Sequence, residues 1–195
     1  MAVQDVRFCW KQTVLPFFFV LLVPFAACGG EAEDPDARQA DDSIDGVETE
    51  RIGPYDHLVG DVAYDDPVPS GGDHLFAPYW LTCGVYDGEV PPELAVHSLE
   101  HGAVWIALGP DATPDDRAAA SELAEGQKVI VSDVEDLEAP VELVSWGRRL
   151  TLESADDPRA EQFVDAFVDA SDAPEATSSC ASMGDPPVPP ELPTS

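Results

Sequence analysis

The chain has 195 residues, of which 44% are hydrophobic and 25% are charged, which is enough for one globular domain of ordinary size. Nine basic residues stand against 39 acidic ones, and the formal net charge is −30 at pH 7. A surface of this charge repels phosphate groups, which argues against nucleic acid as a partner and fits attraction of cations or a high-salt habitat better.

The first 27 residues are typical of a lipoprotein signal peptide. Arg7 and Lys11 precede an apolar run at residues 14–25, which is too short for a comfortable membrane span. Small residues and then Cys28 follow, as in the lipobox of bacterial lipoproteins. We therefore expect export to the cell envelope, periplasmic or on the outer face of the membrane, with anchoring through lipid on Cys28. An ordinary secretory peptide or a short N-terminal anchor is the alternative.

Three further regions are expected after the leader. Residues 28–51 are acidic and nearly free of apolar side chains, so they are predicted to form a solvated, disordered tether. Residues 52–176 form the globular domain, and residues 177–195 are a proline-rich tail without a packing pattern.

The domain opens with a strand-like segment and a loop. Residues 57–64 have a strand-like centre, and residues 65–74 form a loop rich in proline and glycine that ends in His74. Glycine lets the backbone turn tightly, so His74 can approach a distant part of the chain as a metal ligand. The alternative is that His74 is a hydrogen-bonding residue at the surface. His57 is a weaker candidate for a functional residue than His74.

The next segment, residues 75–88, is dense in aromatic side chains, which we expect in the core or in the wall of a pocket. It also contains Cys83. Because Cys9 lies in the leader and Cys28 would carry lipid, Cys83 and Cys180 are left to pair, and an oxidising compartment favours their disulfide. In the alternative, Cys83 is a thiolate ligand near the histidines.

Residues 91–110 carry two histidines between a helix start and an apolar strand. Two prolines and Glu93 begin the helix, and Gly102 is a plausible cap. On such a helix His97 and His101 share one face, one turn apart, so that two imidazoles could converge on one ion. Glu100 lies beside them in sequence.

The rest of the chain alternates strands and helices. Strands are predicted at residues 103–108, 128–132, 141–146 and 148–152, and helices at residues 113–125 and 158–170. Mixed strands with two or three helices on one side predict a single compact domain of the α+β or α/β class.

Five short motifs follow one another along this domain: Pro69-Ser70-Gly71, His74, Gly84-Val85-Tyr86, the HSLEHG segment at residues 97–102 and Ser145-Trp146-Gly147. This succession resembles the uncharacterised bacterial family called domain of unknown function 3105, whose members are commonly exported or membrane-tethered. The resemblance implies a site around His74, His97, Glu100 and His101. It implies no particular activity.

Three functions fit these residues. In the first, His74, His97 and His101 bind zinc or copper, and Glu100 is a further ligand or an acceptor beside them. In the second, a structural or interaction protein of the cell envelope binds no metal.

The third function is zinc-dependent hydrolysis. The spacing of His97, Glu100 and His101 fits the inverted zincin pattern H-x-x-E-H, in which two histidines hold zinc and Glu100 is the catalytic base. Glu161 or Glu175 would then be the distant ligand. Outside this third function, the sequence assigns no catalytic residue.

Overall fold

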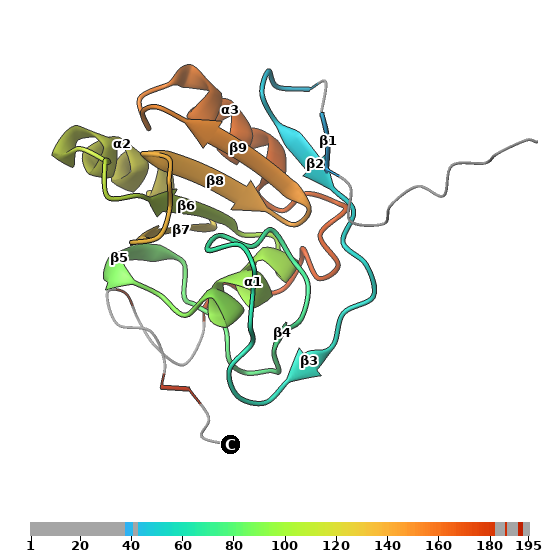
Figure 1. Ribbon diagram of the computed structural model, residues 1–195. Coiled ribbons are helices and arrows are strands. Elements are labelled where there is room, and N and C mark those ends of the chain that lie inside the picture. Colours follow the sequence, from blue (N-terminus) through green and yellow to red (C-terminus); the bar gives the residue numbers. More distant parts are fainter. Residues whose placement is uncertain (1–37, 41–42, 182–185, 187–190, 193–195) are drawn as a thin grey trace, which may run out of the picture. The chain divides into compact units, whose positions relative to one another are not determined.

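The structure is a computed structural model that describes residues 38–40, 43–181, 186 and 191–192 (Figure 1). All of these residues belong to one of two compact units, Glu33–Ser195. The predicted signal peptide, Cys28 and the first part of the predicted tether lie outside the described residues. Within the described residues, no helix has both the length and the apolar character needed to cross a membrane.

The described residues form a mixed α+β fold, as predicted. Its main sheet has seven strands in the order β1-β2-β9-β8-β6-β7-β5. The strands are β1 (Arg38–Ala40), β2 (Glu48–Glu50), β5 (Gly84–Glu89), β6 (Val104–Leu108), β7 (Val129–Asp133), β8 (Val141–Ser145) and β9 (Arg148–Leu152). A second, small sheet pairs β3 (His57–Leu58) with β4 (His74–Leu75). The helices are α1 (Pro92–Glu100), α2 (Pro114–Ala124) and α3 (Pro158–Phe167).

Two crossovers place helices on opposite faces of the main sheet. Strands β5, β6 and β7 are parallel, with β7 in the middle, and the other pairs in the sheet are antiparallel. The chain passes over β7 through α1 to reach β6, and then returns through α2 to β7. Because the two crossovers run in opposite directions, right-handed connections put α1 and α2 on opposite faces. Figure 1 shows α1 apart from α2 and α3.

Alternating side chains of β6 build a hydrophobic core on each face. Val104, Ile106 and Leu108 pack into the core that includes α2 and α3, whereas Trp105 and Ala107 pack into the core that includes α1. Two helices, α2 and α3, thus share one side of the sheet, within the predicted two or three, and α1 covers the other side. The α1 face is the one that carries the histidines.

Part of the segment predicted as a tether is folded. Strand β2 pairs with β9, and the side chains of Ile44 and Val47 are 7% and 1% exposed in the core beside α3. These two apolar residues stand among many acidic ones, which is why composition alone indicated disorder. The ordered domain thus begins before Ile52, the predicted boundary.

The start of the predicted proline-rich tail is also packed. A disulfide joins Cys83 to Cys180, as the sequence predicts, and both cysteines lie against the core on the α1 face. The Cα atoms of the two cysteines are 5.5 Å apart. The disulfide also excludes Cys83 as a thiolate ligand.

Candidate metal centre

Helix α1 supplies two residues of the candidate site from one face. Every side chain from Glu93 to Glu100 is buried, and Leu94 and Leu99 belong to the core on this side of the sheet. His97 and Glu100 are three residues apart, so they project from the same side of the helix. The exposed fractions of both are only 2%, because further segments of the chain cover this face.

The small sheet brings two more histidines to this face of α1. Strands β3 and β4 are parallel, and His57 lies directly opposite His74 in their register. Their ring centroids are 4.5 Å apart. The His74 side chain is fully buried, whereas the His57 side chain is 42% exposed. His57 therefore forms the solvent side of the cluster.

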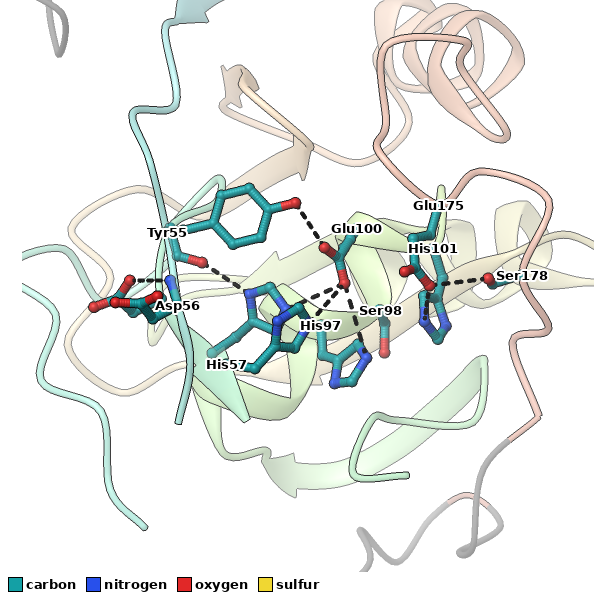
Figure 2. A network of polar contacts seen from close by, with 12 residues as sticks. Tyr55, Asp56, His57, His97, Ser98, Glu100, His101, Glu175 and Ser178 are labelled. Atoms are coloured by element: carbon teal, nitrogen blue, oxygen red, sulfur yellow. Dashed lines mark hydrogen bonds and ion pairs between the residues drawn. The ribbon is translucent and has the colours of Figure 1, made fainter. Parts of the chain in front are cut away.

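Three imidazoles converge on one oxygen of Glu100 (Figure 2). The distance from Glu100 Oε2 is 3.4 Å to His57 Nε2, 3.2 Å to His74 Nε2 and 3.9 Å to His97 Nε2. We call His57, His74, His97 and Glu100 the first group; their ligand atoms all lie within 4.8 Å of one another. Ligands bound tetrahedrally at roughly 2.0–2.1 Å stand about 3.3–3.5 Å apart, so the first group needs little movement to hold a metal ion.

Hydrogen bonds within the first group cannot pair all of its ring nitrogens with Glu100. A carboxylate oxygen has two lone pairs, so it cannot accept good hydrogen bonds from three imidazoles at once. His74 Nδ1 lies 2.8 Å from the Gly72 carbonyl oxygen, and its Nε2 lies 3.2 Å from Glu100 Oε2, where the ring donates when Nε2 carries a proton and offers a lone pair when it does not. His97 Nδ1 is buried without a hydrogen-bond partner among the described residues. A cation that takes the place of the Nε2 proton of His74 would bind this nitrogen and Glu100 together.

The local electrostatics keep Glu100 charged and His97 neutral. Burial alone would raise the pKa of Glu100, but hydrogen bonds from His74 and Tyr55 and the charges of His74 and His57 together lower it to about 2. Burial, with the charges of His74 and His101, lowers the pKa of His97 to about 4. At neutral pH the cluster therefore offers an anionic oxygen and a free imidazole lone pair.

Tyr55 holds the other oxygen of Glu100. Its hydroxyl donates to Oε1 at a distance of 2.7 Å (Figure 2). Burial, this hydrogen bond and the charge of Glu100 raise the pKa of Tyr55 to about 12, so the phenol remains a donor. The Tyr55 ring also packs against Trp146, with centroids 4.9 Å apart. The sequence indicated no role for Tyr55.

His101 lies in a second group of possible ligands. Its Nε2 is 3.5 Å from Glu175 Oε2, and its Nδ1 is 3.2 Å from the Ser179 carbonyl oxygen. We call Glu100, His101 and Glu175 the second group; their ligand atoms also lie within 4.8 Å of one another. Burial lowers the pKa of His101 despite the Ser179 bond and the charge of Glu175.

The structure thus brings together a different set from the predicted one. His74, His97 and Glu100 meet as predicted, but His57 takes the place that the sequence assigned to His101. The signal for His57 was hidden, because the pairing of β3 with β4 joins segments far apart in sequence. The His101 ring lies beside that of His97, with centroids 4.8 Å apart, but its nitrogens face Ser179 and Glu175, which follow the last helix of the fold.

The aromatic segment divides between core and site. Tyr86 is fully buried in the core on the α1 face. Trp80 instead borders the histidines, with its ring centroid 5.3 Å from that of His97 and 4.8 Å from that of His101. Both predicted roles of this segment therefore occur, in different residues.

The geometry differs from that of an inverted zincin. That mechanism needs His97 and His101 on one zinc ion and Glu100 free to activate water. Here the two rings are adjacent, with centroids 4.8 Å apart, but His97 Nε2 faces Glu100 whereas His101 Nε2 faces Glu175, and Glu100 faces the imidazoles as a ligand would. Glu161 is exposed on α3, on the opposite face of the sheet, so it is not the distant ligand.

Comparison with known proteins places the chain in a family. No curated protein and no solved structure matches it. Residues 57–182 match the family described as "Protein of unknown function (DUF3105)". The matched region includes every residue of both groups and both cysteines of the disulfide. Because the match covers more than half of the chain, the protein belongs to the DUF3105 family of unknown function.

Proposed function

We propose that the domain binds a transition-metal ion, zinc or copper(II), in the first group, and that it does so at the cell envelope. The observation that carries the proposal is the convergence of three imidazole nitrogens on one buried carboxylate oxygen. Three nitrogens and one oxygen suit zinc and copper(II), whereas calcium and magnesium prefer sites built from oxygen alone.

Metal binding accounts for this cluster better than a purely structural role. A structural polar network is stable when every buried donor has an acceptor. In the first group, three imidazole nitrogens face one carboxylate oxygen that has only two lone pairs, and His97 Nε2, at 3.9 Å, lies beyond hydrogen-bond distance of it. These features cost stability in a metal-free core and become useful when a cation is bound.

The proposed location comes from the sequence of the leader. We propose that Cys28 carries lipid and holds the domain at a membrane surface, where the acidic shell would raise the local concentration of cations. Replacing Cys28 with alanine is expected to move the protein from the detergent phase to the aqueous phase on phase partitioning. Retention of the variant in the detergent phase would argue against lipid on this residue.

Metal binding is tested by titrating chelator-treated protein with zinc and with copper(II). High salt and an excess of magnesium suppress binding to surface carboxylates. We expect tight binding by the wild type, weakened at least about 100-fold in His74→Ala and in Glu100→Gln, since each removes a ligand. Glu161→Gln is the matched control, because this carboxylate lies on the opposite face of the sheet. Equal affinities in all four proteins would refute the proposal.

A further inference from the structure

We infer that the second group holds a second metal ion, so that Glu100 joins two ions in a dinuclear centre. This inference rests on the proposed function and extends it to His101 and Glu175. The two groups share Glu100, and a carboxylate can bridge ions at the roughly 3.5–4 Å separation of two-metal sites; Oε1 accepts from Tyr55 with one lone pair and keeps the other for an ion.

The orientation of His101 supports a cation beside it. Its Nδ1 faces the Ser179 carbonyl oxygen, which accepts but cannot donate, so a neutral ring places its proton there. The Nε2 lone pair then faces Glu175 Oε2 at 3.5 Å. His74 shows the same arrangement in the first group, with Nδ1 at the Gly72 carbonyl oxygen and Nε2 toward Glu100. A ring nitrogen held in this way is typical of metal-binding histidines.

Glu175 is fixed in place by the backbone around it. Its amide donates to the carbonyl oxygen of Glu100 at 2.9 Å, so the two carboxylate-bearing residues are directly joined. Its Oε2 also accepts from Ser178 Oγ at 3.2 Å (Figure 2). The side chain is 53% exposed, which gives an ion access from solvent.

Lys128 anchors the segment that carries Glu175. Its ammonium group donates to the carbonyl oxygens of His101, Ala176 and Ser178 at distances of 3.3, 3.0 and 2.8 Å. One side chain thus joins the end of α1 to the residues that directly follow Glu175. The ligands of the second group come from segments that are already tied together, so binding an ion requires little ordering.

Metal stoichiometry tests the inference on the full chain. Zinc titration under high salt and excess magnesium is expected to show two ions per chain in the wild type. His101→Ala and Glu175→Gln are each expected to leave one ion, bound by the first group, while Glu161→Gln keeps two. Glu175→Gln changes an exposed side chain, so thermal unfolding should show that this variant remains folded.

The spacing of the ions is tested with copper(II). Two ions joined by one carboxylate are expected to couple magnetically and broaden the electron paramagnetic resonance spectrum. Glu175→Gln should restore the spectrum of an isolated ion.

Each other outcome has a separate meaning. One ion in the wild type, unaffected by either variant, would overturn the dinuclear centre and leave the proposed function standing. Two ions that survive both substitutions would place the second ion elsewhere and would also overturn it. No bound ion in the wild type would refute the proposed function together with this inference.

Discussion

Glu100 owes its position to contacts that the sequence does not show. Oε2 faces three imidazoles, and Oε1 accepts from Tyr55, which lies 45 residues earlier in the chain. A hydroxyl bound to a metal-ligating carboxylate orients that ligand without touching the metal. Tyr55 is therefore a positioning residue in the proposed centre.

Removing this hydroxyl should weaken metal binding without unfolding the domain. Tyr55→Phe is expected to lower zinc affinity roughly tenfold, because Glu100 loses the hydrogen bond that orients it. Competition with a chromophoric chelator measures the change. Tyr79→Phe provides the matched control, since Tyr79 packs against Phe76 outside both groups. An unchanged affinity in Tyr55→Phe would show that Glu100 needs no such support.

At the scale of elements, the junction between α1 and β6 sets the position of the second group. Gly102 follows α1 with a φ of +84°, a conformation that residues with a side chain rarely adopt. A Cβ atom there would lie 3.1 Å from Asp169 Cα and 3.2 Å from Ala176 Cα. The helix can therefore turn into β6 beneath the C-terminal segment only because this position is glycine.

Adding a methyl group at this junction should be costly. Gly102→Ala is expected to lower the free energy of unfolding by about 2–4 kcal/mol, through backbone strain and the clash with two backbone atoms. Gly126→Ala is the control, because Gly126 has a φ of +73° and no atom within 4 Å of the added Cβ. Strain alone should cost about 1–2 kcal/mol there. Equal losses in denaturant titrations would argue that the close packing at Gly102 contributes nothing.

The N-terminus of α2 provides a prediction of pH dependence. Asp116 forms a capping box with Thr113, and its buried carboxylate also accepts from Ser154 and from the Ala155 amide. Hydrogen bonds from Ser154 and Thr113 hold the pKa of Asp116 well below its usual range, against the effect of burial. The ionised form therefore stabilises the fold above the ordinary pKa near 4, and this contribution is lost as pH falls toward the lowered value.

Asp116→Asn should reveal this contribution. At pH 7 the free energy of unfolding of the variant is expected to be about 2 kcal/mol lower than that of the wild type. The difference between the two should narrow below about pH 4. Asp115→Asn is the control, since Asp115 is exposed in the same first turn of the helix. A difference that stays constant down to low pH would contradict the assigned ionisation.

How far the sequence predicts the elements depends on whether their signals are local. Helix α2 was predicted because Thr113, Pro114 and Asp116 are neighbours in the chain, and β6 because its apolar run is continuous. Strand β5 was not predicted, since its six residues include two glycines and two acidic residues in place of an apolar run. It forms because β7 pairs with it, and that pairing cannot be read locally.

At the scale of the whole molecule, the candidate site is built from four distant segments. Strand β3 supplies His57 and strand β4 supplies His74. Helix α1 supplies His97 and Glu100, and the segment after α3 supplies Glu175. The spacing within α1 could be read from the sequence. The position of His57 in the site could not be predicted, because it depends on a parallel pair of two-residue strands. The contact between His101 and the C-terminal segment could not be predicted either.

The charge of the molecule fits a cation-binding role. With a formal net charge of −30, the surface attracts cations over a range set by the ionic strength and increases their rate of arrival. The same charge gives many weak carboxylate sites, so bound metal alone is a poor test of the account. The decisive observation is whether the metal ion lies at the imidazoles.

A crystal structure of the zinc-loaded protein, with anomalous data recorded at the zinc absorption edge, measures that position directly. We expect an anomalous peak within about 2.1 Å of imidazole nitrogens of His57, His74 and His97 and of a Glu100 oxygen. Zinc bound only by surface carboxylates, with the three imidazoles unliganded, would contradict this expectation.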